Sequence, residues 1–174
     1  FRRDELPVPQ ELQVAAEIAL SHRCLETISK LEQAAGEPQE TDNHLAELAA
    51  IASEANHLRC QLNIPEGKKT LEQLILRSLW QLLYDADPST LEEDVKRLQK
   101  SLEIGNQLKI GLSFDRIQEL YYNSLYSQIL PNCVHPEMRS DNSQAFCRWH
   151  PSQISTLLKL GQKLTLDISI WLRD

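Results

Sequence analysis

The sequence has little glycine and no cluster of basic residues. Its 5 glycines in 174 residues are scattered, and no glycine-rich loop occurs. Such loops bring backbone N–H groups against the phosphates of a nucleotide, so a nucleotide site of the Walker or dinucleotide type is excluded. The scattered glycines instead predict helix ends or interruptions, notably at Gly36, Gly105 and Gly161.

The charge balance is acidic, with a formal net charge of −7 and no run of lysine or arginine to offset it. Binding to nucleic acid or to an anionic membrane depends on basic side chains that neutralise phosphates, so we expect neither partner. No apolar run approaches the roughly 20 residues that cross a bilayer. The first residues, FRRDELPVP, lack the apolar core that a signal peptide has after its basic residues.

Cysteine is scarce as well, and 4 cysteines do not make a disulfide scaffold in a chain this long. Cys24 and Cys60 fall within helical patterns, where cysteine packs as a small apolar side chain. We therefore expect a reducing, cytoplasmic location. The sequence starts without methionine, and its first residues resemble the interior of a longer polypeptide. We therefore expect residues 1–174 to be one helical domain cut from a larger protein.

No catalytic constellation can be recognised in the sequence. A serine nucleophile in a G-x-S-x-G turn is missing. The acidic residues Glu92, Glu93 and Asp94 follow a helix start, where the helix dipole favours negative charge, and do not form the facing pair that glycoside hydrolysis needs. His22 and His57 lie within helical patterns, and we expect them to be partly buried. We therefore assign no catalytic residue and leave open whether the chain belongs to an enzyme.

What the sequence does contain favours helix, because Leu, Glu, Gln, Ala and Lys are plentiful. The stretch from Thr70 to Tyr84, TLEQLILRSLWQLLY, is apolar on nearly every side, and Thr70 and Gln73 have the spacing of a capping box. A helix that is apolar all round is covered on several faces. The sequence therefore predicts an all-α fold: a bundle of five or six helices around a central buried helix at about 70–84.

The other helices are predicted from apolar periodicity and from start and stop residues. The first is expected at 10–35, with Val14, Ile18, Leu25 and Ile28 forming its core-facing stripe. Further helices are expected at 43–62, 91–105, 113–130 and 151–160, followed by an apolar piece at 164–172. A polar loop at 37–41 and a chain break at 63–67 are expected between the early helices.

A long irregular loop is predicted at 131–150, where Pro, Asn, Ser and Asp occur throughout and no helical period is visible. Long loops in compact domains tend to be functional or disordered. This loop holds Cys133, His135, Cys147 and His150, and two thiolates with two imidazoles suit tetrahedral zinc. The spacing C-x-H followed by C-x-x-H matches no common finger or ribbon, however. Free thiols and solvated imidazoles are the simpler interpretation, with no cofactor, and a zinc site is the alternative.

Aromatic side chains are candidates for stacking on a sugar ring. Most of them recur at helical spacing, which indicates packing in the core. Two do not fit that pattern, because Tyr122 falls off the main stripe of its helix and Trp149 lies in the 131–150 loop. These two are our candidate substrate-binding residues.

Two stretches resemble the helical C-terminal region of glycoside hydrolase family 57 proteins of the α-amylase/α-mannosidase-like type. The first is Leu6-Pro7-Val8-Pro9 running into LQVAAEIALSHRCLETI, with Ala15-Ala16-Glu17 at its core. The second is LEIGNQLKIGLSFDRIQELYYNSLY. Its matching positions are Leu112, Phe114, Asp115, Gln118, Tyr121 and Tyr122. The resemblance covers about residues 1–130 in arrangement, and the chain from Pro131 onward has no counterpart.

The resemblance implies a non-catalytic accessory domain of a cytoplasmic, polysaccharide-acting enzyme. The family's nucleophile and acid lie in an N-terminal barrel that this chain lacks, so no catalytic residue carries over. The implied partner is the catalytic domain of the same chain, against which this domain would pack, walling one side of the cleft and contacting an α-glucan. A helical protein–protein interaction or assembly module without catalytic activity is the alternative, since it also explains the acidic surface and the absent chemistry.

Overall fold

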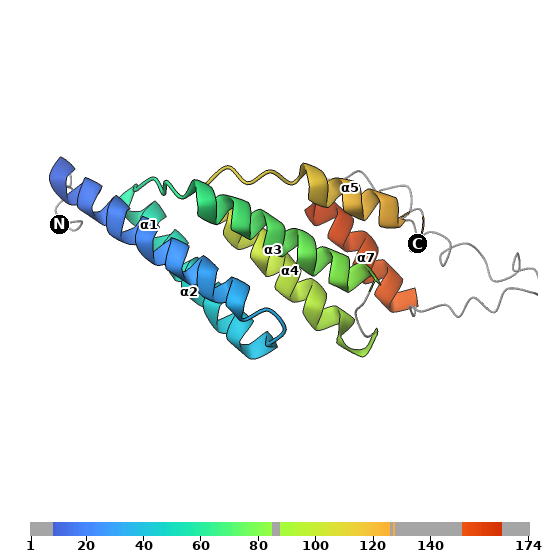
Figure 1. Cartoon of the computed structure of the whole chain (residues 1–174). Coiled ribbons are helices and arrows are strands. Elements are labelled where there is room, and N and C mark those ends of the chain that lie inside the picture. Colours follow the sequence, from blue (N-terminus) through green and yellow to red (C-terminus); the bar gives the residue numbers. More distant parts are fainter. Residues whose placement is uncertain (1–8, 85–87, 126, 128–150, 165–174) are drawn as a thin grey trace, which may run out of the picture. The chain divides into compact units, whose positions relative to one another are not determined.

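The structure is a computed structural model that describes residues 9–84, 88–125, 127 and 151–164. Over these ranges the chain is helical and contains no strand, as the sequence predicts. Its helices are α1 (Gln10–Gln33), α2 (Pro38–Leu58), α3 (Pro65–Tyr84), the short 3₁₀ helix η1 (Pro88–Thr90), α4 (Leu91–Gln107), α5 (Asp115–Ser124) and α7 (Pro151–Lys163) (Figure 1). None of the helices in these ranges combines the length and the apolar character that a membrane crossing requires.

The chain divides into two compact units. Unit 1 contains the residues up to Leu74 together with Lys100–Leu112, and unit 2 contains Ile75–Gln99 together with the residues from Ser113 onward. The division passes through α3 and through α4. The placement of 70–84 at the centre of one bundle therefore stays a prediction, and so does a single domain over 1–174.

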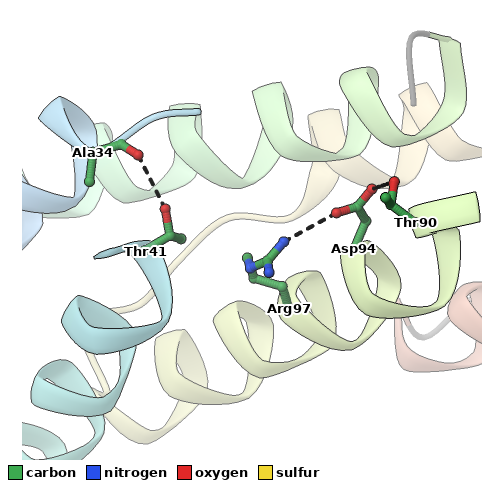
Figure 2. Close-up of polar contacts among 5 residues, drawn as sticks. All are labelled: Ala34, Thr41, Thr90, Asp94 and Arg97. Carbon is green, nitrogen blue, oxygen red and sulfur yellow. Dashed lines mark hydrogen bonds and ion pairs between the residues drawn. The ribbon is translucent and has the colours of Figure 1, made fainter. Parts of the chain in front are cut away.

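In unit 1, α1 and α2 lie side by side and are joined by a short turn (Figure 1). Gly36 occupies that turn with φ +101°, a left-handed conformation that glycine adopts without steric cost. The Thr41 hydroxyl donates to the carbonyl of Ala34 at 3.3 Å, which connects the first turn of α2 to the end of α1 (Figure 2). The buried face of α2 contains the apolar residues Leu45, Leu48, Ile51, Ala52 and Ala55.

Two helices begin earlier than the sequence pattern predicts, because each has a proline in its first turn. Helix α2 starts at Pro38 and α3 starts at Pro65. The missing N–H of proline costs nothing at these positions, where no intrahelical partner exists. The predicted loop and the predicted break are both present, but they lie at residues 34–37 and 59–64 rather than at 37–41 and 63–67, since α2 also ends at Leu58. Thr70 is not a cap, since it lies inside α3.

Gly67 explains how the start of α3 packs in unit 1. A Cβ at this position would lie 3.2 Å from the side chains of Leu25, Ile28 and Ile64. Contacts that short leave no room for a larger side chain without a shift of neighbours. Glycine therefore brings the first turn of α3 close to α1, which is a packing role and not a break in the helix.

The buried face of α1 differs from the predicted stripe. The structure buries Leu20, Cys24, Thr27, Ile28 and Leu31. Val14 and Ile18 are instead 48% and 67% exposed. At about 100° per residue, these two residues lie about 120° around the helix from the centre of the buried face. The prediction is correct for Ile28 and wrong for the first half of the helix.

Helix α4 begins at the predicted residue 91, and its apolar residues Leu91, Val95, Leu98 and Leu102 are all buried. The Thr90 hydroxyl bonds to the carboxylate of Asp94 at 3.0 Å, and Arg97 forms an ion pair with the same carboxylate at 3.1 Å (Figure 2). Asp94 thus places a negative charge in the first turn, where the helix dipole favours it.

In unit 2, α5 packs against α7 through Tyr121. This side chain is 0% exposed, and its hydroxyl donates to the carbonyl of Leu157 at 2.8 Å. A Cβ at Gly161 would lie 2.7–2.9 Å from the Tyr121 ring and hydroxyl, so only glycine allows the ring to sit there unshifted. Gly161 lies inside α7, and its predicted interruption of the helix is wrong.

The ends of several elements also differ from the prediction. Helix α4 continues through Gly105 to Gln107, and a Cβ at Gly105 would collide with the side chain of Leu112. Helix α5 passes into a π-helical turn at Leu125. The rest of the predicted 113–130 helix, apart from residue 127, lies outside the described residues, as do the 131–150 loop and the 164–172 piece after Leu164.

Candidate functional site

The structure places one of the sequence-predicted site residues. Tyr122 lies on α5 and is 47% exposed, which agrees with its position off the buried stripe. Its partner in the prediction, Trp149, lies outside the residues that the structure describes. The four candidate zinc ligands, Cys133, His135, Cys147 and His150, lie outside them too. The sugar contact and the zinc site therefore stay predictions.

Within the described ranges, no three His, Cys, Asp or Glu side chains are grouped to hold a metal ion. His22 and His57 lie on α1 and α2, and both are exposed. The expectation that they are partly buried is wrong. Their helices turn these positions to solvent because the faces that α1 and α2 bury lie elsewhere on each helix.

One side of α1 contains apolar residues that were predicted to face the core but lie at the surface. We call it the α1 flank and define it as Val14, Ile18 and Leu25, which lie within about 40° of one another around the helix. Val14 and Ile18 are half to two-thirds exposed, at 48% and 67%, while Leu25 is partly buried. Leu12 is also exposed, at 52%, but lies more than about 100° away from the flank.

A different side of α1 is bound within unit 1. The Gln13 side chain donates to the carbonyl of Arg59 at 3.2 Å, and the backbone N–H of Gln61 donates to the carboxylate of Glu17 at 3.3 Å. These bonds fix the start of α1 against the segment that follows α2. They also fix the rotation of the helix, which leaves the α1 flank at the surface.

A second exposed feature is an aromatic pair in unit 2. Trp80 is 50% exposed, and its ring lies 5.6 Å from that of Tyr84, centroid to centroid, at 32° between the planes. The hydroxyls of Tyr84 and Ser124 are hydrogen-bonded at 2.8 Å, which holds the Tyr84 ring against α5. Tyr122 precedes Ser124 by two residues and so lies about 200° around α5. Tyr122 therefore points away from the aromatic pair.

A hollow of about 230 Å³ opens at the start of α3 in unit 1. Its walls consist of Lys68, Lys109, the amides Gln61 and Asn63, and apolar residues. Neither lysine forms an ion pair within the described part of the chain. The walls contain no carboxylate, imidazole, thiol or hydroxyl. Apart from its two lysines, this hollow therefore contains no general acid, general base or nucleophile.

Cys24 and Cys60 are thiols in unit 1 with different surroundings. Burial raises the pKa of the Cys24 thiol to about 12, and this side chain is 0% exposed. Burial also raises the pKa of Cys60, helped by the nearby carboxylates of Glu17 and Glu54. Both thiols are thus biased toward the unreactive protonated form, since the thiolate is the nucleophile. Neither has the surroundings of a catalytic cysteine.

We expect Cys60, which is partly exposed, to react with iodoacetamide in the folded protein, while Cys24 stays unmodified. The rate of alkylation at Cys60 should keep rising at pH values above those at which an ordinary thiol is fully deprotonated. The reason is that the raised pKa of Cys60 keeps its thiolate fraction low until higher pH. Peptide mass spectrometry measures each site separately. Unfolding in urea should make both cysteines react, which is the control. Modification of Cys24 in the folded state would contradict the burial that the structure shows.

Comparison of the chain with known protein families, with curated proteins and with solved structures gives no match.

Proposed function

We propose that this chain is a non-catalytic helical accessory domain of a larger, cytoplasmic, family 57-like glycosidase. The observation that carries the proposal is the exposed apolar surface of the helices, above all the α1 flank with Val14 and Ile18 at 48% and 67% exposure. Single exposed apolar residues are normal, but neighbouring ones that lie on one helix face are typical of a surface that another domain covers. The two stretches that resemble the family support the same role.

The chemistry of the described residues is consistent with a role beside an active site. The hollow at the start of α3 has no acid, base or nucleophile apart from its lysines, and both thiols described above are held protonated. In this proposal the domain packs against the catalytic barrel and shapes one side of its cleft. Tyr122 and Trp149 are the proposed contacts to an α-glucan, since an exposed aromatic ring offers an apolar face to a sugar.

The chain of residues 1–174 alone is expected to show no hydrolysis of an α-glucan, because its proposed role is to support catalysis by another domain. The experiment begins with the reading frame around the sequence, which should encode a long N-terminal region with a strand–helix barrel pattern. Amylose and glycogen are then incubated with the 174-residue chain and with the longer protein, and released reducing ends are measured. Activity of the longer protein is the control. Hydrolysis by the short chain would overturn the proposal, as would a reading frame without the N-terminal region.

A helical protein–protein interaction or assembly module is the second candidate, and the aromatic pair favours it. Trp and Tyr are enriched among the residues that dominate binding at protein interfaces, and Trp80 is 50% exposed beside Tyr84. The two candidate functions differ in whether the partner is a separate polypeptide or another part of the same one. This candidate expects a separate polypeptide to co-purify stoichiometrically with the chain, and expects Trp80→Ala to weaken that association. The accessory-domain proposal expects the partner to be the rest of the same polypeptide.

A further inference from the structure

The hollow at the start of α3 is bordered by a segment without helix, residues 60–64, that α1 holds in place. Three polar side chains of α1, four residues apart, bond in turn to the backbone of residues 59, 61 and 63; they are Gln13, Glu17 and Ser21. Exposure alternates along residues 61–64, as it does in an extended chain. Leu62 and Ile64 are each 5% exposed. Gln61 and Asn63 are exposed instead, and both line the hollow.

The two amide side chains in the walls have unused hydrogen-bonding groups. Gln61 and Asn63 donate through their backbone N–H groups to α1. Their side-chain amides form no hydrogen bond within the part of the chain that the structure describes. Each side-chain amide has two N–H donors, so both residues can donate to a molecule in the hollow.

Two lysines bring positive charge to the hollow from anchored positions. Lys68 lies in the first turn of α3, where its backbone N–H donates to the carbonyl of Ile64 at 2.8 Å. Lys109 belongs to the turn after α4, and the Asn56 side chain holds that turn by donating to the carbonyl of Gln107 at 3.0 Å. The backbone that carries each ammonium group is therefore fixed beside the hollow.

The charge of the hollow is opposite to that of the chain. The chain has a formal net charge of −7, yet the walls contain two lysines and no carboxylate. Neither lysine has an ion-pair partner in the described ranges. The neighbouring Glu66 is exposed and does not belong to the walls. A concave surface that contains charge of one sign concentrates ions of the other sign, so this hollow favours an anion.

We propose that the hollow binds a small molecule with two negative charges, through the oxygens of a phosphate group or of two carboxylates. Lysine binds such oxygens as a point charge with three donors, and the amides of Gln61 and Asn63 supply neutral N–H donors. The volume of about 230 Å³ lies below the roughly 300–1,000 Å³ of sites for drug-sized ligands, so the ligand is small. Pro65 and Ile110 give its carbon atoms an apolar wall.

The test is a titration of the isotope-labelled 174-residue chain, followed by two-dimensional NMR of its backbone amides. Inorganic phosphate and malonate are the two ligands, and each is added at constant ionic strength. We expect saturable shifts that fit a single dissociation constant and that are largest for the amides around the hollow. Spectra of each variant without ligand show whether it keeps the fold.

Lys68→Gln and Lys109→Gln are each expected to raise the dissociation constant by about fivefold or more, because each removes one charge-assisted hydrogen bond. Lys69→Gln is the matched control, since Lys69 is an exposed neighbour of Lys68 that lies outside the walls. This control removes the same charge from the chain, and we expect it to change the dissociation constant by less than about twofold because solvent and salt screen it.

A second measurement needs no variant. Acetylation of lysines in the unchanged chain is followed by peptide mass spectrometry with and without the anion. Bound anion should slow the acetylation of Lys68 and Lys109 and leave the rate at Lys69 unchanged.

The two anions identify the class of ligand. Tighter binding of phosphate assigns a phosphate-bearing molecule, and tighter binding of malonate assigns a dicarboxylate, so either result supports the site. The proposal is overturned if neither anion gives a saturable shift. It is also overturned if Lys69→Gln weakens binding as much as the other two variants, which would show diffuse attraction to the surface. An α-glucan is uncharged and the test needs no second domain, so either result leaves the accessory-domain proposal unchanged.

Discussion

Replacing Tyr121 with alanine is expected to lower the free energy of unfolding by about 3–5 kcal/mol, the range for truncation of a large buried aromatic side chain. The ring is 0% exposed and fills the space between α5 and α7 in unit 2, and its hydroxyl donates to the carbonyl of Leu157 at 2.8 Å. Truncation leaves a cavity and removes that bond. Urea denaturation followed by far-UV circular dichroism measures the loss of stability. Before urea is added, the folded variant is expected to keep the secondary structure of the unchanged protein.

The neighbouring Tyr122 is a matched control, because it is the same residue type on the same helix and is 47% exposed. Tyr122→Ala is expected to change the free energy of unfolding by less than about 1 kcal/mol. Tyr121→Phe keeps the ring and should lose about 1 kcal/mol with the hydrogen bond. Equal losses for the two alanine variants would show that α5 does not bury the side that the structure assigns.

The same contact can be approached from α7. Alanine at Gly161 would place its Cβ within 2.7–2.9 Å of the Tyr121 ring and hydroxyl, and the ring cannot move far because it is enclosed and hydrogen-bonded. Overpacking of this kind costs about 1–3 kcal/mol, which exceeds the gain of about 1 kcal/mol from replacing glycine inside a helix. In a protein that already carries Tyr121→Ala, the overpacking penalty should disappear. Gly161→Ala should then leave the free energy of unfolding unchanged or raise it.

The all-helical class and the buried faces of α2 and α4 could be predicted because their apolar residues recur at a single helical period. In α4, for example, Leu91, Val95, Leu98 and Leu102 form one apolar stripe that recurs at helical spacing, while Ile104, which is buried on another side of the helix, stands alone. Tyr122 could be predicted as exposed for the same reason, since it falls off the stripe that contains Tyr121. Sequence periodicity determines a buried face when only one face is apolar.

Proline and glycine account for most of the wrong helix boundaries, because each residue can either interrupt a helix or belong to one. Pro38 and Pro65 can follow a loop or begin a helix, and the choice depends on the path of the chain before them. Gly161 can break a helix or accept a neighbouring side chain at close range. Its role depends on Tyr121, 40 positions earlier in the numbering, which only tertiary packing brings near. Local sequence does not contain that information.

The α1 flank could not be found from the sequence because α1 has two apolar stripes. Val14, Ile18 and Leu25 form one of them, and Leu20, Cys24, Ile28 and Leu31 form the other. Both have helical spacing, so periodicity alone cannot decide which stripe faces the core. The decision comes from contacts outside α1, such as the bond from Gln13 to Arg59 and the ion pair between Arg23 and Glu54 at 3.1 Å.

Leu20→Ala and Ile18→Ala test which stripe of α1 is buried. In the 174-residue chain, Leu20→Ala is expected to lower the free energy of unfolding by about 2–5 kcal/mol, because Leu20 is 3% exposed and its removal leaves a cavity. Ile18→Ala should change it by no more than about 0.5 kcal/mol, because Ile18 is 67% exposed. Urea denaturation of both variants under the same conditions provides the comparison.

The reverse order of effects in the 174-residue chain would mean that α1 is rotated so that the predicted stripe faces the core, and the α1 flank would then not be a surface. If Ile18→Ala is neutral in this chain but destabilises the longer protein, the side chain is buried there by another domain. Because the substitution is the same in both proteins, that difference cannot come from helix propensity or from packing within unit 1. It would measure the contribution of Ile18 to the contact between the domains.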